Sequence, residues 1–386
     1  MTTATAQVRR CLDCGKCTSV CPVARYNRAL SPRRLMRRLA EDRSVSSTEA
    51  IWDCLTCMQC DRRCPQEVPI TPSVPSLRRL SRERGEKPAA TRCSAIDAVA
   101  GLLSQSDLPQ QRLEWLAGTD LRTDPQSKTL LWTGCTPYFD TFFADKGVAT
   151  LAAVKGAIRI LNALGIEPAV SGDERCCGHD QLWAGEEEVF AQLAERNVRL
   201  FEAAAPERVV TVCPECQLTL LNEYQRRFGW PDCPVVHVAE LVAEHADALD
   251  LAATEMVVSF EDPCRLGRHQ GKYDEPRAAL DAIPGLELRE LPRNRAGAVC
   301  CAGNWLACNQ ASKRIQTDLL QAAADRGSDT LVTACPKCMI HLKCAQSGDD
   351  AAVPDLKIRD LADIVAGALT QGTPGAKPGG HDREEV

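Results

Sequence analysis

The feature that most constrains the fold of this chain is an internal duplication within residues 129–370. Each copy contains a single cysteine after a short apolar segment, then an adjacent pair of cysteines, then a Cys-Pro-x-Cys sequence. The ten cysteines are Cys135, Cys176, Cys177, Cys213 and Cys216 in the first copy, and Cys264, Cys300, Cys301, Cys335 and Cys338 in the second. Because corresponding cysteines are 122–129 residues apart, the sequence predicts two units of the same fold.

Both copies alternate between apolar segments typical of strands and amphipathic segments typical of helices. The apolar segments begin at 129 and 256 and recur at 208–211 and 330–333, each time after an amphipathic segment over 189–204 or 311–324. This alternation predicts α/β units with parallel sheets, one over 129–250 and one over 251–370. Ligands of such sheets bind at the carboxyl ends of the strands, where these cysteines fall.

Two further cysteine runs lie near the N-terminus, each with three-residue steps and a final Cys-Pro. The runs are Cys11, Cys14, Cys17 and Cys21, then Cys54, Cys57, Cys60 and Cys64. In bacterial ferredoxins the first three cysteines of such a run hold one [4Fe–4S] cluster and the fourth holds the other. We therefore assign one cluster to Cys11, Cys14, Cys17 and Cys64, and the second to Cys54, Cys57, Cys60 and Cys21. Zinc is the weaker alternative, because four-cysteine zinc sites usually consist of two pairs and a long spacer.

The segment between these runs contains a helix predicted from Ser31-Pro32 onward, with four arginines on one stripe. This length favours a helical ferredoxin domain over 1–92, followed by a linker over 93–128 with two short helices. The Gly-, Pro- and charge-rich tail over 371–386 is predicted to be disordered. Residues 1–92 carry a formal charge of +9 and the remainder −15. We interpret the positive charge as a balance for anionic clusters and as steering for an acidic redox partner, because no nucleic-acid recognition module accompanies it.

The expected cellular compartment decides how the high cysteine content is interpreted. The N-terminal residues lack the apolar core of a secretory signal, and no apolar run reaches eighteen residues, so we expect a cytoplasmic protein without a membrane span of its own. In a reducing compartment, 22 cysteines indicate metal sites rather than disulfides. The four cysteines outside the motifs are expected to be buried as small apolar residues: Cys93, Cys233, Cys308 and Cys344.

Five cysteines in each copy are one more than a cubane cluster needs. Two adjacent thiolates suit separate irons of a larger or opened cluster better than one tetrahedral zinc. A buried structural metal remains the alternative at this point.

The order of these motifs resembles the D subunit of heterodisulfide reductase, in effect a fusion of the C and B subunits of the soluble enzyme. The resemblance extends from Cys11 to about Cys344, and the segment 262–277 shares it. It implies a noncubane [4Fe–4S] cluster in each five-cysteine motif, where a disulfide is cleaved one electron at a time. The cofactors would be two cubane and two noncubane clusters, and the catalytic residues would be Cys176, Cys177, Cys264, Cys300 and Cys301.

Some residues depart from the family pattern. Ala302 separates Cys301 from Gly303, and Arg265 replaces an aromatic residue or histidine. Arg265, Arg268 and His269 are candidates for holding an anionic thiol, with charge balance for the cluster as the alternative. His179 and His341 are candidate proton donors, with a supporting role near the cysteines as the favoured alternative.

Two functions follow from this resemblance. The leading hypothesis is that the chain is the part of a disulfide reductase that passes electrons from ferredoxin clusters to noncubane clusters. The alternative is an electron-transfer component of a flavin-dependent dehydrogenase of the glycolate or lactate type, or of an electron-bifurcating complex. No Gly-x-Gly-x-x-Gly follows a predicted strand, so a flavin would belong to a partner. Expected partners are a flavoprotein, a protein like the A subunit of the reductase, or a cytochrome, with a small disulfide or thiol as substrate.

Overall fold

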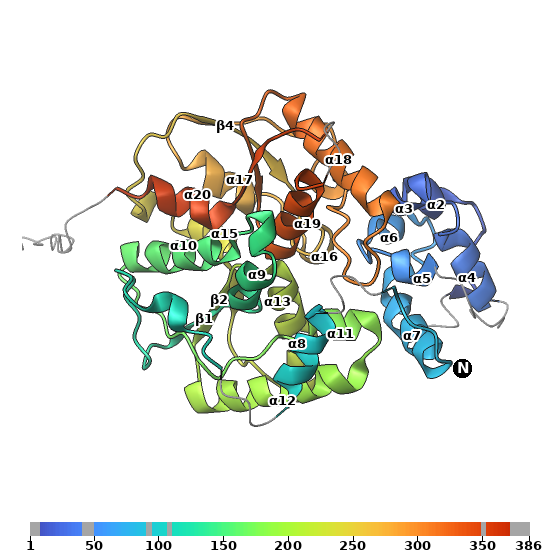
Figure 1. Cartoon of the computed structure of the whole chain (residues 1–386), viewed down its shortest axis with the longest axis horizontal. Helices are drawn as coiled ribbons and strands as arrows, with labels where there is room; N and C mark the ends of the chain where they lie inside the picture. The colour runs from blue at the N-terminus through green and yellow to red at the C-terminus, as the bar shows by residue number, and fades with distance from the viewer. Residues whose placement is uncertain (1–7, 41–49, 90–94, 106–109, 349–352, 371–386) are drawn as a thin grey trace, which may run out of the picture.

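The computed structural model describes residues 8–40, 50–89, 95–105, 110–348 and 353–370, so Cys93 and the predicted tail lie outside the described residues. A helical N-terminal unit lies at one end of the molecule, and two α/β units form the rest (Figure 1). Among the described residues, no helix has the length and apolar character needed to cross a membrane. The boundaries predicted at residues 92, 128 and 250 stay predictions.

The N-terminal unit consists of short helices joined by the two cysteine runs. These are α2 (Lys16–Val20), α3 (Pro22–Tyr26), α4 (Pro32–Ala40), α5 (Ala50–Asp53), α6 (Gln59–Arg63) and α7 (Ile70–Glu83). The Arg-rich helix thus begins at Pro32, as predicted, where the missing proline N–H leaves no helical bond unmade. Met36, Ile51 and Val74 form the apolar centre of the N-terminal unit. Two helical segments follow in the predicted linker, α8 (Ala95–Ser104) and the 3-10 turn Glu114–Leu116.

The first α/β unit contains a parallel sheet in the order β1-β2-β3. Its strands are β1 (Thr129–Trp132), β2 (Arg208–Thr211) and β3 (Val235–His237). The helices around them are α9 (Thr136–Phe142), α10 (Thr150–Ala163), α11 (His179–Ala184), α12 (Glu187–Ala204), α13 (Pro214–Thr219), α14 (Gln225–Phe228) and α15 (Val238–Glu244). Cys135 lies between β1 and α9, and Cys213 lies between β2 and α13, as the strand pattern predicted.

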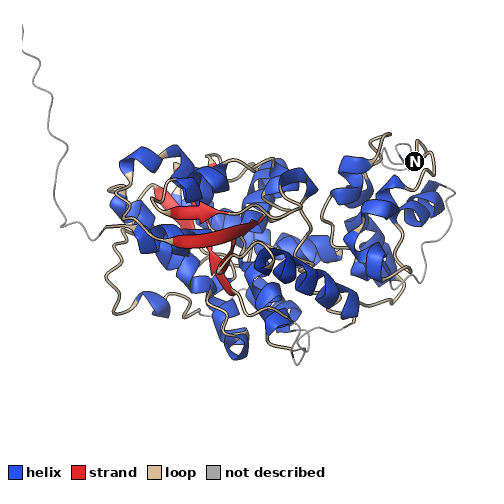
Figure 2. Ribbon diagram, turned by 90° about the horizontal axis from the view of Figure 1, so that it is seen from above, coloured by secondary structure: helices blue, strands red, loops and turns tan. Residues whose placement is uncertain are grey.

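The second α/β unit repeats this arrangement with one more strand, in the order β5-β4-β6-β7, all parallel. Its strands are β4 (Met256–Glu261), β5 (Leu286–Leu288), β6 (Thr330–Thr333) and β7 (Lys357–Asp360). Its helices are α16 (Gly267–Gln270), α17 (Glu275–Asp281), α18 (Gln310–Ala324), α19 (Pro336–Gln346) and α20 (Leu361–Ala368). Helices cover the strands of both sheets (Figure 2), so the α/β prediction is confirmed.

The two α/β units share one apolar core, which fixes how they face each other. Leu131 and Ile158 of the first unit belong to the same buried cluster as Phe260 and Val332 of the second. Helices α10 and α20 cross closely at Gly156, where an added Cβ would lie 2.5 Å from the carbonyl oxygen of Ala362. A glycine is therefore required at this crossing.

Candidate iron–sulfur centres

Two hollows in the N-terminal unit are each lined by four cysteines. Hollow A is lined by Cys11, Cys14, Cys17 and Cys64. Hollow B is lined by Cys21, Cys54, Cys57 and Cys60. In both, the fourth cysteine of one run thus lies with the first three of the other. Apolar side chains form much of the remaining lining, together with Lys16 and Arg33 in hollow A, and four thiols around such a hollow fit a [4Fe–4S] cluster.

The first α/β unit gathers five cysteines, called the first set: Cys135, Cys176, Cys177, Cys213 and Cys216. The Sγ atoms of Cys177 and Cys216 are 3.4 Å apart. A hydrogen bond with Cys176, followed by burial, raises the pKa of Cys135 well above its usual value, so these two thiols are also neighbours. Cys213 caps α13 and contacts Cys216. The backbone thereby brings three segments far apart in sequence to one point.

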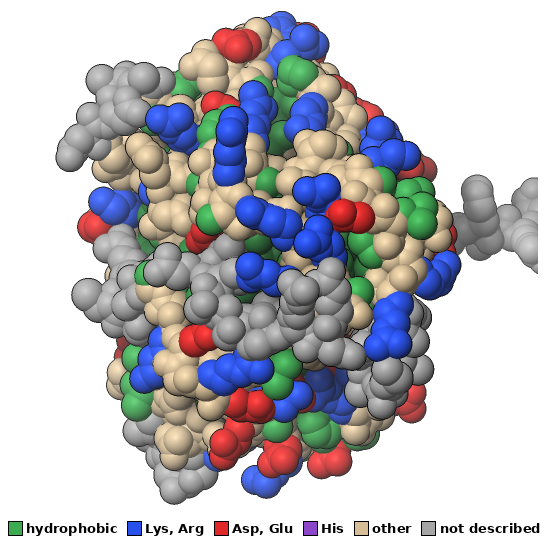
Figure 3. Space-filling view, turned by 90° about the vertical axis from the view of Figure 1, so that its right-hand side faces the viewer, with side chains coloured by type: hydrophobic (Ala, Val, Ile, Leu, Met, Phe, Trp, Pro, Cys, Tyr) green, Lys and Arg blue, Asp and Glu red, His purple; other side chains and the backbone are tan. Residues whose placement is uncertain are grey.

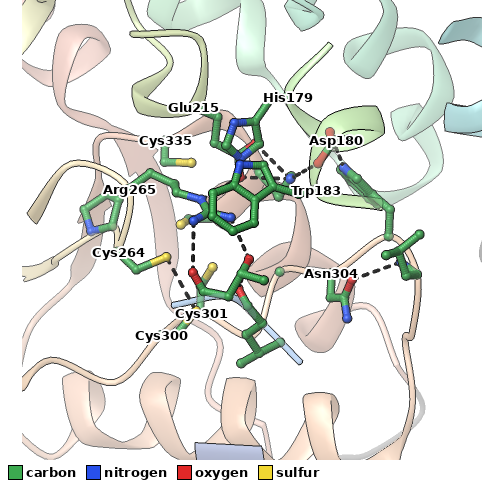
Figure 4. Close-up of a pocket in the computed structure, with 18 of the residues that line it drawn as sticks. His179, Asp180, Trp183, Glu215, Cys264, Arg265, Cys300, Cys301, Asn304 and Cys335 are labelled. Carbon is green, nitrogen blue, oxygen red and sulfur yellow. Dashed lines mark hydrogen bonds and ion pairs between the residues drawn. The ribbon is translucent and has the colours of Figure 1, made fainter. Parts of the chain in front are cut away.

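The second α/β unit gathers the second set: Cys264, Cys300, Cys301, Cys335 and Cys338. The Sγ atoms of Cys264 and Cys300 are 3.9 Å apart. The Sγ atoms of Cys301 and Cys338 lie within 4.8 Å of each other, and Cys335 caps α19 close to Cys338. All five line a cavity of about 40 Å³ between the three units (Figure 4). Adjacent thiols and five donors exceed what one tetrahedral zinc takes, so the set fits a larger iron–sulfur cluster.

The second set touches hollow B directly. Cys57 of hollow B lies in the same buried cluster as Cys300, and the interaction between these two thiols lowers the pKa of Cys57 to about 6, against its burial and with help from Arg268. Cys54 of hollow B lines the same cavity as the second set, whereas no cysteine of the first set lines it. A thiol-to-thiol contact of this kind joins the ferredoxin part to one α/β unit.

Arg265, Arg268 and His269 all contact the N-terminal unit, and Arg265 also lines the cavity of the second set. Arg265 donates to the carbonyl oxygen of Thr56 at 2.9 Å and to its hydroxyl at 2.6 Å. Arg268 donates to the carbonyl oxygens of Cys57 at 2.6 Å and Ala298 at 2.7 Å. The prediction that these residues hold an anionic thiol stays a prediction, and both guanidinium groups already have acceptors in the loop of hollow B. They attach the second α/β unit to the loop of hollow B, because buried guanidinium groups need several carbonyl acceptors.

An ion pair joins the two α/β units at one duplicated position. Glu215 lies between Cys213 and Cys216, and Lys337 lies between Cys335 and Cys338. Lys337 Nζ is 2.8 Å from Glu215 and also pairs with Asp180. Burial alone would lower the pKa of Lys337, but the two carboxylates raise it well above its usual value, so Lys337 stays charged. The third position of the Cys-Pro-x-Cys motif thus carries opposite charges in the two copies.

His179 and His341 are both buried beside cysteines. His179 Nδ1 is 2.8 Å from the hydroxyl of Thr219, and burial lowers the pKa of His179 well below its usual value. Burial also lowers the pKa of His341 to about 3, although Cys301 opposes the shift. Both imidazoles are therefore neutral at physiological pH, which favours a supporting role over donation from an imidazolium.

Two buried carboxylates were not predicted from the sequence. Glu174 receives hydrogen bonds from the N–H groups of Thr133 and Gly134 and pairs with Arg112 at 3.0 Å. Glu261 lies at the end of β4, with Cys301 and Cys338 as neighbours. For Glu261 the available signal was a charged residue that ends a largely apolar strand shortly before a cysteine; Glu174 lies in no strand and had no such signal.

The cysteines outside the motifs differ from the expectation. Cys308 is exposed, and Cys233 and Cys344 are half-buried, so the prediction of full burial is wrong for these three. None of these three belongs to a hollow or to either five-cysteine set.

Comparisons with known families agree with this geometry. The cysteine-rich domain family matches residues 130–221 and 258–343, one match in each α/β unit. The 4Fe-4S dicluster domain family matches residues 7–68. A crystal structure of a hypothetical protein from Helicobacter pylori has the same fold, with a TM-score of 0.55, 13% identity, and coverage of 89% of this chain and 67% of that chain.

Similar proteins are redox components. The chain is 27% identical, over 96% of its length, to a probable membrane-anchored ferredoxin of Chromohalobacter salexigens, and it spans 61% of that protein. It is 27% identical to the B subunit of fumarate reductase (CoM/CoB) from Methanothermobacter marburgensis, over 94% of this chain and 72% of that one. It is 26% identical to the D subunit of dihydromethanophenazine:CoB–CoM heterodisulfide reductase from Methanosarcina barkeri, over 93% of each chain.

The fold and the cysteine sets define the class of this protein: an iron–sulfur protein with a 4Fe-4S dicluster domain and two cysteine-rich α/β domains. The resemblance to the D subunit of heterodisulfide reductase, inferred from the cysteine order, is confirmed over nearly the whole chain. The chain is an iron–sulfur electron-transfer protein of the heterodisulfide reductase and fumarate reductase type.

Proposed function

We propose that this chain passes electrons from hollows A and B to the second cysteine set, where a disulfide is reduced. The contact between Cys57 of hollow B and Cys300 of the second set carries this proposal, because it leaves no intervening residue between the two thiol groups. Hollow A and hollow B are interlocked through Cys64 and Cys21, which gives the order A, then B, then the second set.

The residues divide into ligands and supports. Each hollow would hold a cubane [4Fe–4S] cluster, and each five-cysteine set would hold a noncubane one, which supplies one-electron chemistry at iron. Within the second set, Cys264, Cys300 and Cys301 line the cavity and are proposed as the catalytic cysteines. Cys176 and Cys177 of the first set are proposed for the same role, although they do not line that cavity. Arg265 and Arg268 hold the loop of hollow B in contact with the second set.

The electron donor is proposed to be a partner with an acidic surface. The end of the molecule formed by the N-terminal unit shows many Lys and Arg side chains (Figure 3). Arg34, Arg37 and Arg38 of α4 are exposed there, as is Cys14 of hollow A. Opposite charges raise the rate of encounter between redox proteins. A flavoprotein, a protein like the A subunit of heterodisulfide reductase, or a cytochrome in the cytoplasm would fit, while the substrate would be a small disulfide.

A second function is favoured by the contents of the cavity. Lys337, Asp180 and Glu215 line it with paired charges, and its volume is about 40 Å³. A small buried space filled by paired charges suits electron transfer to a partner better than the binding of a large disulfide. The chain would then be an electron-transfer component of a flavin-dependent dehydrogenase or of an electron-bifurcating complex.

Iron content and activity together test these proposals. Anaerobically purified protein is expected to contain about sixteen irons, four per cluster. The native complex is expected to reduce a small disulfide when an electron donor is supplied. An iron content near eight with zinc in the remaining sites contradicts the noncubane assignment, whereas about sixteen irons without disulfide reduction leaves the electron-transfer function.

A further inference from the structure

Glu261, the last residue of β4, is a fully buried carboxylate that its neighbours satisfy on one side only. Its Oε2 atom accepts a hydrogen bond from the hydroxyl of Thr333 at 2.8 Å. Its Oε1 atom has no hydrogen-bond partner among the described residues. The side chain is 0% exposed, and no salt bridge reaches it from the part of the chain that the structure describes. A buried carboxylate oxygen without a partner is costly, so this position calls for a positively charged group that the side chains do not supply.

The neighbours of this carboxylate are two thiols of the second set. A carboxylate oxygen of Glu261 and the Sγ atoms of Cys301 and Cys338 all lie within 4.8 Å of one another. Three buried donor atoms of this kind can share one metal ion. Thiolates and a carboxylate together are donors that iron accepts.

The first set has no equivalent group among the described residues. Trp132 occupies the corresponding strand position, since Trp132 pairs with Thr211 as Glu261 pairs with Thr333. The indole of Trp132 packs against Phe201, with ring centroids 5.3 Å apart. Two buried acids next to the first set in sequence already have partners: Glu174 has backbone N–H groups and Arg112, and Glu215 has Lys337. The duplication therefore places a free carboxylate oxygen beside one set only.

We propose that Glu261 is an oxygen ligand of an iron in the second set, next to the thiolates of Cys301 and Cys338. This inference rests on the proposed function, because it requires an iron–sulfur cluster in the second set. The second set would then have five thiolates and one carboxylate, and the first set five thiolates alone. Because a carboxylate is a harder donor than a thiolate, the iron bound to it would differ electronically from all other irons of the protein.

The direct test is magnetic resonance on the full chain, purified anaerobically with its clusters. Glutamate labelled with ¹³C at the side-chain carboxyl is incorporated, and electron–nuclear double resonance is recorded on the paramagnetic second-set cluster. A ligating carboxylate is expected to give a ¹³C coupling that Glu261→Gln removes, because glutamine keeps the shape and can still accept from Thr333. The matched control is Glu174→Gln beside the first set, which is expected to leave the coupling unchanged.

The outcomes separate the two proposals. No ¹³C coupling in the wild-type cluster, or a coupling that persists in Glu261→Gln, overturns the ligand assignment while the cluster and the proposed function stand. An iron content showing that the second set holds no cluster overturns the proposed function first. If Glu261→Gln fails to assemble the cluster, the presence or absence of the ¹³C coupling in the wild-type protein decides the ligand assignment. Mössbauer spectra of ⁵⁷Fe-loaded protein give an independent measure: one iron with a higher isomer shift than its neighbours is expected in the wild type.

Discussion

The two cysteine-rich units share their strand register but surround their thiols with different groups. The first set lies against Trp132 and receives no cysteine from the described part of the N-terminal unit, whereas the second set has Glu261 and contacts Cys57. At the interface the third residue of the Cys-Pro-x-Cys motif is Glu215 in one copy and Lys337 in the other. The duplicated scaffold thus fixes where the thiols lie, and the residues around them have diverged so that, among the described residues, the second set contacts a cysteine of hollow B and the first set does not.

The largest expected effect is on disulfide reduction, and it distinguishes the second cysteine set from the first. Cys300→Ser is expected to abolish disulfide reduction by the complex, because this thiol contacts both Cys264 and Cys57. The clusters of hollows A and B should remain reducible by dithionite, as followed by electron paramagnetic resonance. The counterpart Cys176→Ser is expected to leave reduction of the second set by hollow B intact. Wild-type disulfide reduction in Cys300→Ser would show that the second set is not the site.

The ion pair between the units comes next. Lys337→Met is expected to lower the free energy of unfolding by about 3–5 kcal/mol, because it leaves the carboxylates of Glu215 and Asp180 buried without a cation. Denaturant unfolding under anaerobic conditions measures this change. Adding Glu215→Gln to Lys337→Met is expected to restore part of the lost free energy of unfolding, since one of the two unpaired buried carboxylates is removed. The control Lys272→Met breaks a more exposed pair with Glu240 and should cost about 1 kcal/mol or less.

The ends of β3 and β7 predict opposite pH dependences for the two units. Burial lowers the pKa of His237 to about 4 and raises the pKa of Asp360 to about 8. For His237, stability is lost as the pH falls from its unfolded value near 6.5 through about 4. For Asp360, stability is present below its unfolded value near 3.8 and is lost as the pH rises through about 8.

Substitution of these two residues checks the signs. Asp360→Asn is expected to flatten the loss of stability on the alkaline side, and asparagine still accepts the hydrogen bond from the N–H of Ala362 at the start of α20. His237→Asn is expected to flatten the loss on the acidic side instead. Unfolding free energies measured between about pH 4 and 9 give the slopes. An unchanged slope in Asp360→Asn contradicts the role of that carboxyl group.

The smallest expected effect concerns the residue after each cysteine pair. Gly178 and Ala302 both have positive φ, of 79° and 56°. Ala302→Gly is expected to stabilise by about 1 kcal/mol at most, because an L-residue in this region is strained. Gly178→Ala is expected to destabilise by more than this, because its Cβ would also lie 2.7 Å from the ring of Phe190. Thermal unfolding of both variants measures the difference, and equal effects would contradict it.

Much of the candidate site could be predicted from the amino-acid sequence. The three-residue cysteine steps, the Cys-Pro pairs and the repeated five-cysteine order follow from chemistry local to the chain, because thiols that share a cluster need fixed short spacings. The parallel strands, the Arg-rich helix and the strand-end position of the cysteines were predictable from the periodicity of apolar and polar residues, which is also a local property of the chain. The misassigned residues were Cys233, Cys308 and Cys344, whose exposure depends on segments far away in sequence.

By itself, the sequence determined the number of cysteine motifs, the duplication and the α/β class. Only the tertiary structure decided which set contacts the ferredoxin part, because the Cys57–Cys300 contact joins residues 243 positions apart. It also decided that Glu215 and Lys337 pair, and that Glu261 has an unpaired oxygen beside Cys301. Such pairings have no local sequence signal, since they arise where three units pack together and the charges they bury must find partners.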